Sequence, residues 1–284
     1  MAPSLMRSAA PSFDALVPAF SASTCSLDVS AVSPAHRRLG LYYEDLIGTL
    51  LSGALPCDPL SVRRNVQCAQ AGITAGEFDF LYRSTEQWFH LETAVKFYLC
   101  CGDGSALEHF VGPGRRDRLD IKWQRLQQHQ LRLASHPVGR ECLDRLGIRN
   151  VHSQLLMPGY LFYRAGAEVP GSTLHREISP RHQQGWWLPL RDLELLPASR
   201  DHRYAILSKL RWLAPARLAD DQALDWHALR EQLVARAGPA LVVQLSCVPV
   251  SGSRNRWCET GRGFVVPDDW EPTVLESRIQ SRRH

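Results

Sequence analysis

The first clear pattern along the chain is that of an amphipathic helix. Its apolar positions recur at spacings of four, three and four residues: Leu39, Tyr43, Leu46 and Leu50. These spacings place the four side chains on one face of an α-helix. The pattern begins near His36 and stops near Gly53 and Pro56, which are typical of a helix end. We therefore predict a first helix over this segment.

Three strand-like segments follow, at about 62–69, 76–83 and 88–101. Short connections containing Gly72 or the polar run 84–87 separate them, which favours an antiparallel meander. The third segment alternates with period two. One set of alternate positions is mostly apolar: Leu91, Thr93, Val95, Phe97 and Leu99. The other set carries charge: His90, Glu92, Ala94, Lys96 and Tyr98. We expect one continuous strand with an apolar face and a charged face.

A second helix is predicted over 117–134, after the turn at 112–114. It has an apolar seam, made of Leu119, Trp123, Leu126 and Leu133. It also has a basic ridge, made of Arg118, Lys122, Arg125, His129 and Arg132. A further strand at 153–163 completes the order αβββαβ. We predict an α/β fold of the α+β type with a mixed sheet: a loosely ordered arm over 1–35, a core over 36–165, and an α/β extension over 166–284.

Composition excludes some classes of protein and leaves others open. The 284 residues are 44% hydrophobic and 22% charged, which is typical of a globular chain, and no apolar run reaches the roughly 18 residues of a membrane span. A net charge of +4 permits an anionic partner without requiring one. The eight cysteines include no CxxC pair, and the first residues lack the apolar core of a signal peptide. We expect a cytoplasmic protein without disulfide-linked partners.

Lysine is scarce in this chain. Only Lys96, Lys122 and Lys209 are lysine, so 33 − 3 = 30 of the basic residues are arginine. A chain that uses arginine almost everywhere is expected to keep lysine where a compact, deprotonatable charge is needed. Lys96 is therefore a candidate functional residue.

The candidate site lies on the predicted hairpin of the second and third strands. Asp79 and Glu92 are expected side by side there, and two neighbouring carboxylates repel each other unless a cation lies between them. Glu44 lies beside the apolar seam of the first helix and is expected to point toward the sheet. The hypothesis is a magnesium-type site. The structural alternative is an ion pair among Asp79, Glu92 and Lys96.

Six segments carry a resemblance to a known family: RLGLYYEDL (38–46), GEFDFL (76–81), HLETAVKFYL (90–99), GPGRRDRLDIKWQRLQQHQL (112–131), GYLFY (159–163) and FVVPDDW (264–270). They resemble the bacterial family known as domain of unknown function 1853, over about residues 36–270. That family looks like a member of the PD-(D/E)XK nuclease-like superfamily, whose core is αβββαβ. The resemblance implies a metal-dependent phosphodiesterase ancestry.

The resemblance also implies roles for individual residues. Glu44, Asp79 and Glu92 would match the acids that hold Mg²⁺ or Mn²⁺, and Lys96 the lysine that orients the attacking water. The superfamily spacing is acid-x-Lys, whereas Lys96 follows Glu92 by four residues and Ala94 occupies the usual lysine place. A β-bulge or the long lysyl stem would close that gap; otherwise Lys122 takes the role or the role is empty.

Three functions are consistent with these residues. The first is a Mg²⁺- or Mn²⁺-dependent nuclease-like protein that hydrolyses phosphodiester bonds in DNA or RNA, with the basic ridge on the backbone phosphates. The second is the same fold without turnover, which binds nucleic acid or a protein partner. The third is an interaction scaffold without nucleic acid. His90 and His129 are expected beside the site and not as metal ligands, because carboxylates dominate it.

Overall fold

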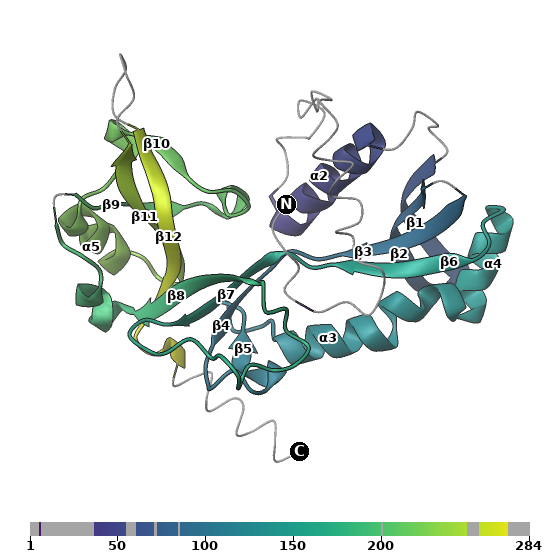
Figure 1. Cartoon of the computed structure of the whole chain (residues 1–284), viewed down its shortest axis with the longest axis horizontal. Helices are drawn as coiled ribbons and strands as arrows, with labels where there is room; N and C mark the ends of the chain where they lie inside the picture. Colours follow the sequence, from purple (N-terminus) through teal and green to yellow (C-terminus); the bar gives the residue numbers. More distant parts are fainter. Residues whose placement is uncertain are drawn as a thin grey trace. The chain divides into compact units, whose positions relative to one another are not determined.

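The computed structural model describes Met6 and residues 37–54, 61–70, 73–84, 86–199, 201–248 and 256–271 (Figure 1). The fold is α+β, with two mixed sheets. The described residues form two compact units. The first unit comprises those within 1–96, 121–158 and 179–181, and the second those within 97–120, 159–178 and 182–284. Apart from Met6, the arm predicted over 1–35 lies outside the described residues.

The first unit is built on a four-stranded sheet with the order β1-β2-β3-β6. Its strands are β1 (Val62–Gln70), β2 (Ile73–Ser84), β3 (Gln87–Thr93) and β6 (Val151–Leu156). Its helices are α2 (Leu39–Ala54), α3 (Leu119–Gln128), the 3-10 helix η5 (Gln130–Ser135) and α4 (Pro137–Arg145). The β1-β2-β3 meander is antiparallel as predicted, and β3 pairs with β6 in parallel. In Figure 1, α2 covers one face of this sheet and α4 the other.

The core of the first unit lies between the sheet and the η5–α4 segment. Its buried residues are Cys68, Phe78, Leu81, Leu133, Val138, Cys142, Leu143 and Ile148. The approach of η5 to α4 depends on Gly139, because a Cβ there would lie 1.9 Å from the carbonyl oxygen of Leu133. Phe78 and Leu81 share this cluster although strict alternation along β2 predicts opposite faces, so the alternation is interrupted near Asp79.

The buried stripe of α2 differs from the predicted seam. Tyr43, Ile47 and Leu51 are buried, whereas the other three predicted seam residues are only half-buried. Beside this stripe, Arg64 of β1 pairs with Asp45 and lies against the backbone of Gly48.

Two predicted strands are each divided in the structure. The segment 88–101 is not one strand, because β3 ends at Thr93 and β4 (Lys96–Cys100) begins a strand of the other sheet. The segment 153–163 is divided likewise into β6 and β7 (Gly159–Arg164). Pro158 lies at the second break and has no N–H to donate to a ladder. Its carbonyl accepts the N–H of Lys96 at 3.0 Å. Both segments thus pass from one sheet to the other. The two compact units are therefore not separated at a single boundary near residue 165.

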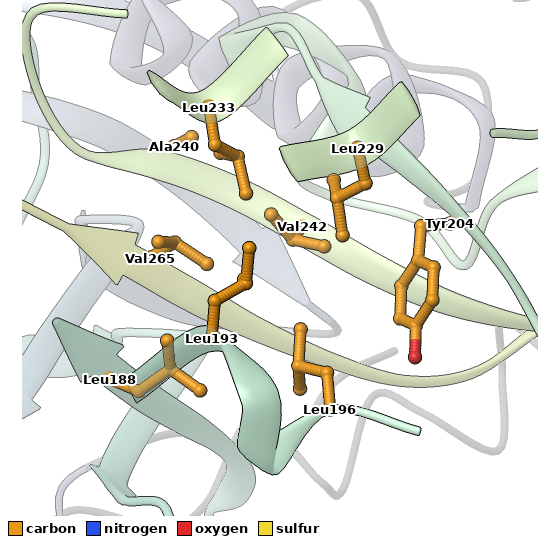
Figure 2. Close-up of a cluster of buried hydrophobic side chains, with 9 residues drawn as sticks. All are labelled: Leu188, Leu193, Leu196, Tyr204, Leu229, Leu233, Ala240, Val242 and Val265. Carbon is orange, nitrogen blue, oxygen red and sulfur yellow. The ribbon is translucent and has the colours of Figure 1, made fainter. Parts of the chain in front are cut away.

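The second unit is built on a sheet with the order β5-β4-β7-β8-β12-β11-β9, with β10 paired to β12. The remaining strands are β5 (Phe110–Val111), β8 (Gln183–Pro189), β9 (Arg203–Leu207), β10 (Arg217–Ala219), β11 (Ala240–Val248) and β12 (Arg256–Val266). Its helices are α5 (Trp226–Val234) and the 3-10 helices η4 (Leu107–His109), η6 (Leu190–Leu195), η7 (Lys209–Arg211) and η8 (Asp220–Gln222). Figure 2 shows its core, where Leu229 and Leu233 of α5 lie over Val242 and Val265.

Candidate functional site

Asp79 lies on β2 next to the end of β3. The ladder of these strands is in register as far as Phe80 and Leu91, which brings the following pair, Asp79 and Glu92, to adjacent positions. One carboxylate oxygen of Asp79 accepts the backbone N–H of Thr93 at 2.8 Å. Burial, followed by the charge of Glu92, raises the pKa of Asp79 to about 6, although the bond from Thr93 opposes the shift.

Glu92 is the most buried of the candidate acids, with 1% of its side chain exposed. Its Oε1 atom accepts a hydrogen bond from the amide of Gln130 on η5. Its Oε2 atom has no hydrogen-bond partner within the described part of the chain. Burial raises the pKa of Glu92 to about 7, against the lowering effects of Lys122 and the Gln130 bond. The predicted pair of neighbouring carboxylates is therefore present in the structure.

Two further acids lie in the same electrostatic neighbourhood. Glu44 on α2 has its pKa raised to about 7, first by burial and then by the charges of Asp79 and Glu77. Glu77 precedes Asp79 by two residues on β2. Two residues at this spacing in a strand share a face, and this is the sequence signal that would have identified Glu77. Among the residues that the structure describes, no three His, Cys, Asp or Glu side chains are grouped closely enough to enclose a metal ion.

Lys122 on α3 is directed toward the acids through a glutamine. Its Nζ atom donates a hydrogen bond of 2.9 Å to Oε1 of Gln130, whose amide nitrogen in turn donates to Glu92. Burial lowers the pKa of Lys122, and the charge of Glu92 opposes that shift. Gln130 could not be identified from the sequence, because several glutamines surround it and nothing in the pattern distinguishes one of them.

Lys96 does not share a strand with Glu92, contrary to the prediction. It is the first residue of β4, beyond the break after Thr93. Lys96 lies near enough to Lys122 to lower the pKa of that lysine. However, of the two lysines it is Lys122, and not Lys96, that is among the main charges lowering the pKa of both Asp79 and Glu92.

His90 is completely buried beside Glu92. Its Nδ1 atom lies 3.3 Å from the hydroxyl of Ser153, and burial lowers the pKa of His90 to about 4. The imidazole is therefore neutral near pH 7. Its place next to Glu92 agrees with the expectation of a histidine beside the site.

An open hollow of about 580 Å³ gives solvent access to this region. It is lined by Ala75, Gly76, Glu77, Asp79, Arg125, His129, Gln130 and Leu133. Arg125 and His129 are exposed, so the wall contributed by α3 and η5 is basic while the β2 wall is acidic. We call this cavity the acidic hollow.

The basic ridge predicted on one continuous helix is divided in the structure. The α-helix ends at Gln128 and continues after His129 as the 3-10 helix η5, which has a different side-chain spacing. Arg118 precedes α3 and binds both carboxylate oxygens of Asp120 at 2.7 Å. Lys122 is half-buried against Gln130, and only Arg125, His129 and Arg132 are exposed. The prediction of one continuous helix is therefore wrong, while the phosphate contacts of the five ridge residues stay a prediction.

The geometry defines an α+β protein whose first unit has a pair of carboxylates next to an open hollow. Asp79 lines the hollow, and the buried Glu92 beside it is linked to Lys122 through Gln130. The profile of the family described as Domain of unknown function (DUF1853) matches residues 2–266, and the chain belongs to that family. This confirms the family resemblance seen in the sequence and extends it toward the start of the chain. No curated protein and no solved structure matches the chain.

The structure also describes most of the cysteines and the helices that bear on a membrane span. The cysteines at 68, 100, 101, 142, 247 and 258 are all free thiols. In the described residues, no helix has the length and apolar character needed to cross a membrane.

Proposed function

We propose that the first unit is a metal-dependent phosphodiesterase centre of the PD-(D/E)XK nuclease-like type, acting on DNA or RNA. The observation that carries the proposal is the pairing of Asp79 with Glu92, whose Oε2 atom is buried without a hydrogen-bond partner among the described residues. The chain order of α2, β1, β2, β3, α3 and β6 in this unit supports it, because it matches the αβββαβ core that the family resemblance implies.

The donor set fits a hard divalent cation. Burial raises the pKa of Glu92 to about 7 and that of Asp79 to about 6, so the ionised pair lacks sufficient compensating charge. Mg²⁺ is commonly held by one or two carboxylates, with waters and substrate phosphate completing the shell, so three protein ligands are not required. Asp79 and Glu92 would hold Mg²⁺ or Mn²⁺, and Glu44 would assist. The ion would polarise the scissile phosphate and lower the pKa of the attacking water.

The chain's own cations take the remaining roles. In this proposal Lys122, held by Gln130, offsets negative charge next to Glu92, and it takes the part that the family pattern gives to a lysine. Lys96, at the start of β4, has a supporting part in this proposal. Arg125 and His129 line the acidic hollow and bind the phosphates on either side of the reacting bond.

A second candidate function is nucleic-acid binding without turnover. The contacts that already engage the acids favour it: Gln130 donates to Glu92, and Thr93 donates to Asp79. Such contacts are also what a structural polar network would use to keep buried carboxylates in place. In this case the basic surface of α3 and η5 is the functional part.

Cleavage of single-stranded and duplex DNA and RNA, with Mg²⁺ or Mn²⁺, tests the first proposal. Asp79→Asn and Glu92→Gln should abolish cleavage while leaving the fold intact by circular dichroism. Glu86→Gln is the matched control, because Glu86 is an exposed acid in the turn between β2 and β3, and it should cleave normally. Equal activity in all four proteins would identify a contaminant and reject the catalytic proposal. Each protein is therefore purified by the same route.

A further inference from the structure

A second hollow adjoins the acidic hollow. It has a volume of about 360 Å³ and is lined by Ala75, Gln128, His129, Arg132, Leu133, Ser135, His136 and Pro137. It shares Ala75, His129 and Leu133 with the acidic hollow, so the two cavities are direct neighbours. We call it the basic hollow.

The two hollows differ in charge. Glu77 and Asp79 line the acidic hollow, whereas the walls of the basic hollow include no carboxylate. Arg132 also has no ion-pair partner among the described residues, unlike Arg118, which is bound by Asp120. A cation that is not neutralised within the fold remains available for an anionic ligand.

His136 adds a directed donor to the basic hollow. Its Nδ1 atom accepts the backbone N–H of Val138 at 3.3 Å, as the N-cap of α4. A neutral imidazole that accepts at Nδ1 carries its hydrogen on Nε2, so His136 has a donor left for a ligand. The hydroxyl of Ser135 and the amide of Gln128 complete a wall of neutral and cationic donors.

We propose that the basic hollow binds a backbone phosphate of a nucleic-acid strand whose neighbouring phosphodiester lies in the acidic hollow. This inference rests on the proposed function for its ligand and deepens it by assigning a substrate subsite. The acids repel a phosphate in the acidic hollow when no metal is present, whereas the basic hollow attracts one without metal. The strand is therefore anchored in the basic hollow independently of the metal.

The test is fluorescence anisotropy with labelled 12-nucleotide single strands of DNA and RNA, in EDTA, with Asp79→Asn as the parent protein. Arg132→Gln should weaken binding about fivefold or more and reduce the slope of log K against log salt by about 0.7, the value expected for one phosphate contact on a single strand. His136→Asn, which keeps an acceptor for the α4 cap, should weaken binding about threefold. Inorganic pyrophosphate should compete with the strand.

Arg140→Gln is the matched control, because Arg140 is an exposed arginine of α4 that lines neither hollow. It should bind within about twofold of the parent. Equal losses in the Arg132 and Arg140 variants would mean diffuse attraction to a basic surface and would overturn the subsite. Absence of binding to either strand would overturn it as well. Ser135→Glu is an independent second variant that places a carboxylate in the basic hollow, and it should weaken binding about tenfold.

The two proposals fail separately. Binding that depends on Arg132, in a wild-type protein that never cleaves, would support the subsite and reject catalysis. Cleavage that depends on Asp79 but is indifferent to Arg132→Gln and Ser135→Glu, in both kcat and KM, would support catalysis and reject the subsite.

Discussion

The Oε2 atom of Glu92 lies 3.7 Å from the Nε2 atom of His90, and both side chains are almost completely buried. Neither atom has a hydrogen-bond partner in the described part of the chain. The separation is too long for a direct hydrogen bond. A buried acid and a buried base thus face each other without a hydrogen bond between these two atoms. The stability of the fold should therefore depend on pH.

Stability should fall as the pH rises through the range in which Glu92 ionises. The pKa of Glu92 is about 7 in the fold against an ordinary value of 4.5, so the folded state holds the proton more tightly between these pH values. The free energy of unfolding therefore decreases from about pH 4.5 to 7, by at most about 1.4 kcal/mol per pH unit for one proton. Glu92→Gln should flatten this slope and be more stable than wild type at pH 8. A Glu92→Gln protein that is less stable at pH 8, in urea unfolding, would contradict the prediction.

His90 should produce the opposite dependence at lower pH. Its pKa is about 4 in the fold against 6.5, so the unfolded state binds more protons between these values and stability falls as the pH drops from 6.5 to 4. His90→Gln should remove this component, and the difference between the two proteins should grow toward pH 4. An NMR titration of the His90 imidazole with a midpoint near 6.5 would disprove the burial argument.

Mg²⁺ or Mn²⁺ should raise the melting temperature more at pH 8 than at pH 5.5. A metal binds the ionised carboxylates, and at pH 5.5 protons compete for Asp79 and Glu92. A saturating ion at about 100 times its Kd adds about 2.7 kcal/mol, and EDTA should reverse the effect. Asp79→Asn should lose the shift in differential scanning fluorimetry, while Glu86→Gln should retain it. An equal shift in the Asp79→Asn protein would place the ion elsewhere.

Lys122 should matter more than Lys96 if the chain cleaves phosphodiester bonds. Lys122 is linked to Glu92 through Gln130, whereas Lys96 begins a strand of the other sheet. We expect Lys122→Met to lower kcat about 100-fold, the scale of losing one charge-stabilising donor, and Lys96→Met to lower it less. The exposed Lys209 supplies the control variant Lys209→Met. Partial recovery in Lys122→Arg would show that charge is the property required, and the reverse ranking of the two lysines would return the role to Lys96.

Gly139→Ala should destabilise the first unit by about 3 kcal/mol or more, as overpacking against rigid backbone does. The new Cβ would lie 1.9 Å from the carbonyl oxygen of Leu133, so η5 would have to move. Because η5 carries Gln130, the same variant should weaken metal binding. Gly114→Ala is the control, since a Cβ there meets no atom within 4 Å. Unchanged urea midpoints for both variants would show that the η5–α4 contact is not tight in solution.

The local patterns of the sequence determined much of the first unit. The 3.6-residue period predicted α2, although the buried stripe is rotated from the predicted seam. Short polar connections predicted the β1-β2-β3 meander. Alternation and hairpin register together predicted that Asp79 and Glu92 are neighbours. These features depend on residues that are close in sequence, and local periodicity encodes such contacts directly.

Only the tertiary structure decided the rest. The alternation of 88–101 continues unbroken through Ala94, yet the chain leaves one sheet there and enters the other. The strand β6, which pairs with β3, also ends at this point, just before Pro158. The inward position of Lys122 depends on Gln130, which faces Glu92 only because the α-helix gives way to η5 after His129. The neutral or ionised state of Glu92 follows from burial by segments distant in sequence. Hydrophobic periodicity carries no information on such long-range contacts, because they depend on which elements pack together and not on the order of residues within one element.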